Sequence, residues 1–75
     1  MYAVNRMSKN GEWEKVTTIE SFAAATNFAR AILPAIFIDL YVDNEDEEYY
    51  KEEFDKQALT DDLYIEGIIN VEKIA

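Results

Sequence analysis

The chain has 75 residues, with two glycines, one proline, no cysteine and no histidine, and its net charge is −9. This length supports one small hydrophobic core, which excludes a second domain. The missing cysteines and histidines exclude disulfides, thiolate or imidazole metal sites, and Ser-His or Cys-His catalysis.

Hydrophobic residues make up 49% of the chain, too many for a disordered acidic tail. We therefore expect residues 1–75 to fold as one domain. The N-terminus lacks the pattern of a secretory signal, and no apolar run approaches the ~20 residues that span a bilayer. These features predict a cytoplasmic protein with no membrane partner.

The first half of the chain predicts a β-hairpin and a helix. Residues 2–7 and 12–17 alternate in polarity around Asn10-Gly11, a strong hairpin signal. Thr17 and Glu20 have the spacing of a capping box, and apolar residues then recur at helical intervals as far as Pro34. We expect a helix over residues 18–33 that ends at the proline.

The second half predicts a strand, a helix and a last strand. Residues 35–43 alternate, which would place Ile36, Ile38, Leu40 and Val42 in the core and Phe37 outside. Residues 44–58 favour an amphipathic helix, with Tyr50 and Phe54 on its inner side. Residues 63–73 are rich in β-branched residues and predict a strand; a third helix starting near Thr60 is the alternative.

These elements give an α+β fold in the order ββαβαβ, or ββαβα with a terminal helix. Both helices should pack on one face of an antiparallel or mixed sheet, because so short a chain cannot cover two faces.

Charge is unevenly placed along the sequence. Residues 1–38 sum to +1, whereas residues 39–75 sum to −10. A negative surface repels nucleic acid and anionic membranes and attracts basic proteins. The expected partner is therefore a cationic protein, with a metal ion as the alternative.

An acidic stripe is predicted on the helix at 44–58. Glu45, Glu48, Glu52 and Asp55 have spacings of three and four, so they share one helix face with ~5–6 Å between neighbours. This interval is of the same order as the spacing of phosphates along a DNA strand. The candidate partner-binding residues are Asp39, Asp43, Glu45, Glu48, Tyr49, Glu52, Glu53, Asp55, Asp61 and Asp62.

A purely solvating role is the alternative for this stripe. Acids in the first helical turn are ordinary capping residues. However, like charges at i, i+4 destabilise a helix by a few tenths of a kcal/mol per pair, and few lysines are interleaved here. That cost favours a binding role.

The sequence contains no complete motif for calcium binding, phosphate binding or catalysis. Asp43, Glu45 and Glu47 match the first positions of a calcium loop, but Glu48 replaces its glycine and Phe54 its bidentate glutamate. No glycine-rich phosphate loop is present. We therefore expect no enzyme activity, no cofactor and no dedicated metal site. Weak, loose binding of divalent ions by the acids is the alternative.

The segment EDEEYYKEEFD, Glu45 to Asp55, with the small size and the lack of catalytic parts, resembles the acidic DNA-mimic inhibitors of phages, of the anti-CRISPR and anti-restriction type. The resemblance implies a stoichiometric inhibitor that occupies the nucleic-acid-binding surface of a nuclease or CRISPR effector in the host cytoplasm. The alternative is a small assembly protein that forms a homodimer through helix 18–33, with the acids serving only solubility.

Overall fold

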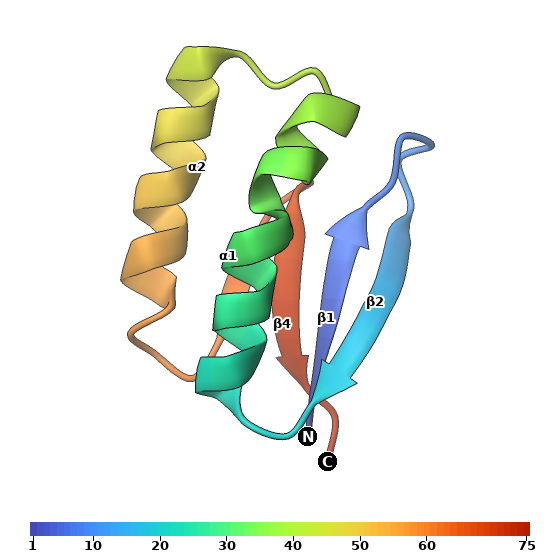
Figure 1. Cartoon of the computed structure of the whole chain (residues 1–75), viewed down its shortest axis with the longest axis vertical. Coiled ribbons are helices and arrows are strands. Elements are labelled where there is room, and N and C mark those ends of the chain that lie inside the picture. Colours follow the sequence, from blue (N-terminus) through green and yellow to red (C-terminus); the bar gives the residue numbers. More distant parts are fainter.

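Six elements follow one another in the order ββααββ in the computed structural model, which describes residues 1–75 (Figure 1). They are β1 (Tyr2–Met7), β2 (Trp13–Ile19), α1 (Phe22–Asp39), α2 (Asn44–Gln57), β3 (Leu63–Ile65) and β4 (Ile69–Lys73). The α+β class is confirmed, but the expected ββαβαβ order is wrong.

The N-terminal hairpin is confirmed. Ser8 Oγ accepts hydrogen bonds from the backbone N–H groups of Asn10 (3.2 Å) and Glu12 (3.3 Å), and Gly11 adopts a positive φ of 80° in the turn. Only glycine takes that conformation at little cost. Strand β2 continues to Ile19, so it includes the residues expected to start the helix.

Helix α1 differs from its prediction at both ends. It begins after Ser21 rather than after Thr17, and it continues through Pro34 to Asp39. Pro34 has no N–H to donate to the carbonyl of Arg30, four residues earlier. It lies on the exposed side of the helix, so this carbonyl can bind water instead.

The predicted strand at 35–43 is therefore wrong. Leu33, Ile36 and Phe37 continue the helical spacing of the buried Ala25 and Ala29, and this packing outweighs the alternating pattern. As a result Phe37, expected outside, is 2% exposed, whereas Ile38, expected in the core, is 75% exposed.

The second helix is confirmed within one residue. A short turn containing Tyr41, with a φ of 55°, separates α1 from α2. Asp43 is the N-cap of α2, and its side chain makes no capping hydrogen bond. Phe54 is buried and Tyr50 packs against the core, as expected.

The C-terminal segment is extended, so the helical alternative is wrong, but it forms a hairpin instead of one strand. Gly67 has a φ of 75° and lies in the turn between β3 and β4, closed by the Ile68 N–H bond to the Ile65 carbonyl (3.0 Å). Leu63 pairs with Val71 and Ile65 with Ile69.

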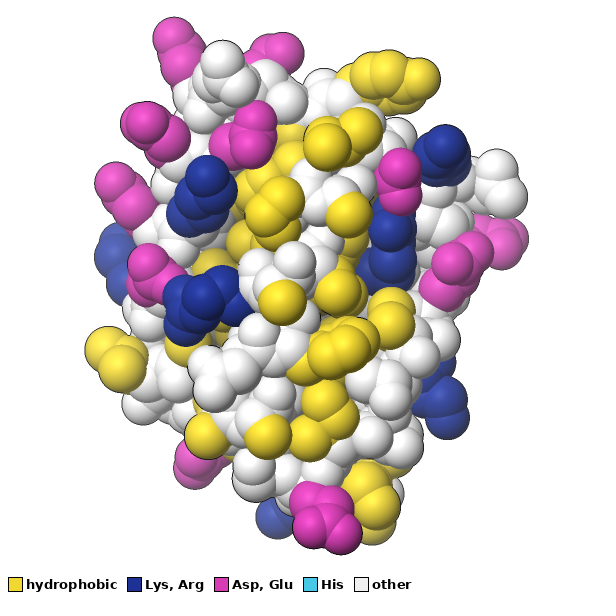
Figure 2. Space-filling view, in the orientation of Figure 1, with side chains coloured by type: hydrophobic (Ala, Val, Ile, Leu, Met, Phe, Trp, Pro, Cys, Tyr) yellow, Lys and Arg dark blue, Asp and Glu magenta, His cyan; other side chains and the backbone are white.

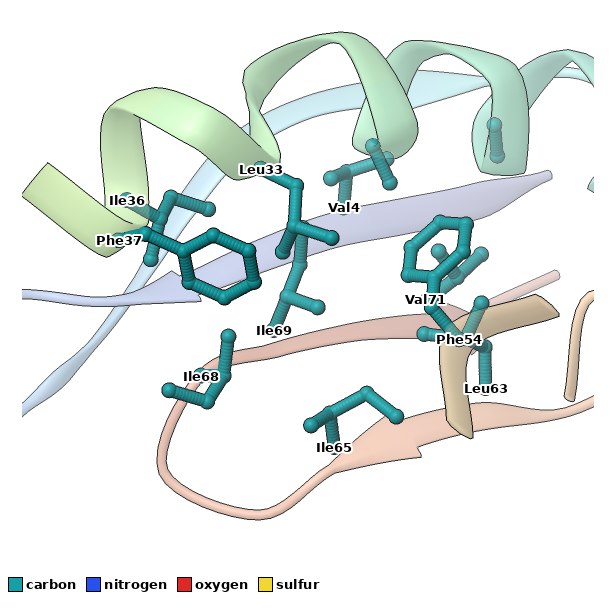
Figure 3. Close-up of a cluster of buried hydrophobic side chains, with 12 residues drawn as sticks. Val4, Leu33, Ile36, Phe37, Phe54, Leu63, Ile65, Ile68, Ile69 and Val71 are labelled. Atoms are coloured by element: carbon teal, nitrogen blue, oxygen red, sulfur yellow. The ribbon is translucent and has the colours of Figure 1, made fainter. Parts of the chain in front are cut away.

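The sheet has the order β2-β1-β4-β3 and is antiparallel throughout. Both helices lie on one of its faces (Figure 1), and the core fills the space between them. In Figure 3 side chains from α1, including Leu33 and Phe37, point toward Val4, Ile69 and Val71 of the sheet, and Phe54 of α2 lies over Leu63.

The other face of the sheet has no helix over it. Asn5 Nδ2 donates to Asn70 Oδ1 across the central strands (2.7 Å), and Trp13 on one edge strand meets Tyr64 on the other, with ring centroids 5.8 Å apart. Polar groups and this aromatic pair therefore cover the open face.

Helix α1 is long and apolar enough to cross a membrane by length and composition, with a mean hydropathy of 1.3 over 18 residues. One such helix is weak support for a membrane span, because the core helix of a soluble protein has the same properties. Here one face of α1 packs on the sheet, and 33% of its residues are buried.

Candidate protein-binding surface

Three carboxylates on α2 face solvent without a basic partner in the chain. Glu45, Glu48 and Glu52 are all exposed, and none of them takes part in a salt bridge within 4.0 Å. They lie opposite the buried Phe54 on the helix, so their charges point away from the core. We call Glu45, Glu48 and Glu52 the outer acidic row.

Asp55, at the end of the predicted stripe, is already paired. Its carboxylate accepts a hydrogen bond from the guanidinium of Arg30 on α1, and the same guanidinium lies over the ring of Phe54, 5.0 Å from its centroid. Asp55 is thus partly neutralised within the chain, and it links α2 to α1.

Asp39 is also paired inside the molecule. It ends α1, and its carboxylate lies 2.9 Å from Arg6 and 4.0 Å from Lys9 of the hairpin. Asp39 therefore faces the hairpin and does not extend the outer acidic row.

The remaining predicted acids lie at the two ends of α2. Asp43 caps its beginning, whereas Asp61 and Asp62 are exposed in the loop after it. At 1.5 Å per residue the 14-residue helix separates these ends by about 21 Å. The structure therefore brings together only the middle of the predicted set.

Glu53 and Tyr49 flank the outer acidic row on the side toward β3. The Glu53 carboxylate lies 3.6 Å from Lys56 on the same helix. Tyr49 is 59% exposed, and its ring meets that of Tyr50 edge-on, with centroids 5.6 Å apart. Tyr50 in turn stacks on the buried Phe37 (6.0 Å), so the exposed ring rests on the core.

The acidic side chains do not cover one flank alone. Figure 2 shows Asp and Glu gathered over α2, with Lys and Arg among them, and a smaller acidic group over the hairpin. Glu12 and Glu14, both exposed, belong to that hairpin.

A second exposed surface lies on α1, the helix that the sequence offered as a homodimer contact, and it extends past the predicted end of that helix. Figure 2 shows hydrophobic side chains in a band over α1. The exposed apolar residues of this band, which we call the α1 stripe, are Ala24, Ala31, Pro34, Ala35 and Ile38. Their helical spacing is visible in the sequence only when the helix is continued past Pro34.

The sequence reasoning also missed a groove between α2 and β3. Its volume is about 490 Å³, and it is lined by Tyr49, Tyr50, Glu53, Gln57, Tyr64 and Glu66 among others. Three of the five tyrosines line it, and their convergence depends on how β3 docks beside α2.

No group of three or more carboxylates is arranged to hold a metal ion. Comparisons with protein-family models, curated proteins and solved structures found no match to this chain. Any function must therefore be argued from the surfaces themselves.

Proposed function

We propose that this chain is a stoichiometric protein inhibitor that binds the basic nucleic-acid-binding surface of a bacterial defence nuclease by imitating DNA. The target is a restriction enzyme or CRISPR effector, and the outer acidic row with Tyr49 forms the centre of the contact. This function needs no catalytic group, metal ion or cofactor.

The observation that carries the proposal is the unpaired state of the outer acidic row. Asp39 and Asp55 have basic partners within the chain, whereas Glu45, Glu48 and Glu52 have none. Repulsion between Glu48 and Glu52 at i, i+4 costs the helix a few tenths of a kcal/mol. A basic partner would remove that repulsion, and lysines or arginines that normally neutralise phosphates are suited to it.

A rigid support strengthens this interpretation. Helix α2 is held to α1 through Asp55 and Arg30 and to the sheet through Phe54. The carboxylates are therefore presented on a fixed helix, which lowers the entropy lost when a partner binds.

Charge reversal in the row tests the proposal. Glu48→Lys with Glu52→Lys should weaken binding to the target nuclease by ~100-fold or more, because two attractive contacts become repulsive. The control, Glu12→Lys with Glu14→Lys on the hairpin, makes the same change in net charge and should alter binding only a few-fold.

Binding and inhibition of DNA cleavage would be measured on a panel of purified restriction and CRISPR nucleases at several salt concentrations. Affinity should fall steeply as salt rises, and duplex DNA should compete with the inhibitor. Equal binding by the two double variants, or no competition by DNA, would contradict the proposal.

The α1 stripe favours a second candidate function, a small assembly protein that forms homodimers. Ile38 is 75% exposed, and the alanines of the α1 stripe allow close approach of another helix. In this function α1 contacts α1 of a second copy, and the acids of α2 keep the dimer soluble.

A further inference from the structure

The groove between α2 and β3 combines aromatic rings with carboxylates and contains no base. Tyr49, Tyr50 and Glu53 line it from α2, and Tyr64 and Glu66 line it from β3 and the turn that follows. No lysine or arginine is among its lining residues. The lining is therefore complementary to a cation.

The walls of this groove are held in place without a ligand. Tyr49 rests edge-on against Tyr50, which stacks on Phe37 of the core. The backbone N–H of Tyr64 donates to Oε1 of Gln57 (2.6 Å), which ties β3 to the end of α2. A ligand would enter a formed site and lose little affinity to reorganisation.

We propose that this groove receives the side chain of one arginine of the partner protein. A planar guanidinium can stack on a tyrosine ring and bind carboxylates through two parallel hydrogen bonds, whereas a lysine ammonium cannot do both. The rings of Tyr49 and Tyr50 supply the stacking contact. Glu66, which has no basic partner in the chain, and Glu53, which shares its charge with Lys56, supply the ionic contact.

This proposal rests on the proposed function and extends it. Tyr49 lies between the outer acidic row and the groove, so the two form one continuous surface. A nuclease would place several bases along the row and insert one arginine beside Tyr49. The row would provide long-range attraction, and the groove would fix the orientation of the complex.

Small-molecule probes test the groove without the nuclease. N-acetyl-arginine amide would be titrated into the ¹⁵N-labelled chain, with N-acetyl-citrulline amide, an uncharged molecule of similar shape, and N-acetyl-lysine amide as comparisons. We expect saturable shifts at Tyr49, Tyr50 and Glu66 with the arginine probe, weaker ones with lysine, and none with citrulline.

Substitutions inside and outside the groove test whether the arginine probe binds there. Tyr49→Ala and Glu66→Gln change exposed residues and should leave the fold intact, but each should weaken arginine binding about fivefold, as expected for loss of one cation–π or ionic contact. Glu48→Gln, which removes the same charge as Glu66→Gln outside the groove, should change it less than about twofold.

Equal shifts with citrulline or lysine, or unsaturable shifts spread along all the acids of α2, would overturn the arginine site. Its failure can be separated from failure of the inhibitor function. If Tyr49→Ala and Glu66→Gln leave nuclease binding unchanged while charge reversal in the row abolishes it, only the arginine site is wrong. If arginine binds the groove but no nuclease binds the chain, only the inhibitor function is wrong.

Discussion

Ser21 shows how a single residue decides where α1 begins. The sequence offered Thr17 as the cap, with Glu20 three residues later, but Thr17 pairs with Val4 in the sheet. The β-branched pair Thr17-Thr18 fits a strand better than a helical turn. Ser21 then caps the helix, with its Oγ accepting a hydrogen bond from the Ala24 N–H (3.1 Å).

Removing this cap should destabilise the protein. Ser21→Ala is expected to lower the free energy of unfolding by about 1 kcal/mol, because the Ala24 N–H loses its acceptor. Urea unfolding followed by circular dichroism measures the change. Ser21→Asp, which keeps an acceptor at the cap, should stay close to the unsubstituted chain; equal losses in both variants would show that capping is not the cause.

For single residues, the sequence predicted which acids face outward on α2 but not which acids form salt bridges with basic residues of the chain. The interval of 25 residues between Arg30 and Asp55 contains no local signal. Their contact depends on the side-by-side placement of two helices. The same is true of Arg6 and Asp39, which meet only because α1 ends beside the hairpin.

Among the elements, α1 gave the largest error of prediction. Proline normally ends or kinks a helix, and the residues after it alternate as a strand would. Tertiary packing decided the outcome, because the neighbours Ile36 and Phe37 can both be buried in the same core only if the helix continues. Helix α2 was predictable from its periodicity, and the first hairpin from the agreement of its turn and alternation signals.

Pro34 should still cost α1 stability. Pro34→Ala restores an N–H for the carbonyl of Arg30 and is expected to raise the free energy of unfolding by at least about 1 kcal/mol. Urea titration measures this. Ala31→Ser, an exposed change one turn earlier, serves as the control and should shift stability by no more than about 0.5 kcal/mol. A Pro34→Ala chain of unchanged or lower stability would contradict this account.

On the scale of the whole molecule, the sequence predicted the class of fold and the acidic helix but not the sheet order. Local patterns cannot specify that β1 pairs with β4, because the paired residues lie at opposite ends of the chain. The same long-range arrangement creates the groove between α2 and β3 and leaves the α1 stripe uncovered. The groove was therefore out of reach of sequence reasoning, whereas the apolar face of α1 was predicted but not its extension past Pro34.

Oligomeric state distinguishes the two candidate functions at this scale. The assembly function predicts a dimer in sedimentation velocity that persists at 0.5 M salt (about a 4 Å Debye length), since apolar contacts are not screened. Ile38→Asp should convert it to a monomer, because a charge would be buried in the contact. Leu59→Asp, at an exposed site outside the stripe, should leave it a dimer. A monomer at every concentration would contradict the assembly function and leave the inhibitor function standing.

The pairing of Tyr2 with Lys73 and of Arg6 with Ile69 also bears on biosynthesis. β1, the first of the four strands along this chain, lies at the centre of the sheet beside β4, the last of the four. Until the segment through Lys73 has left the ribosome, the nascent chain can form the first hairpin and fragments of helix but has no closed core. Folding must therefore be completed after translation of that segment. Deletion of either central strand would leave one hairpin and one unpaired edge strand instead of a three-stranded sheet.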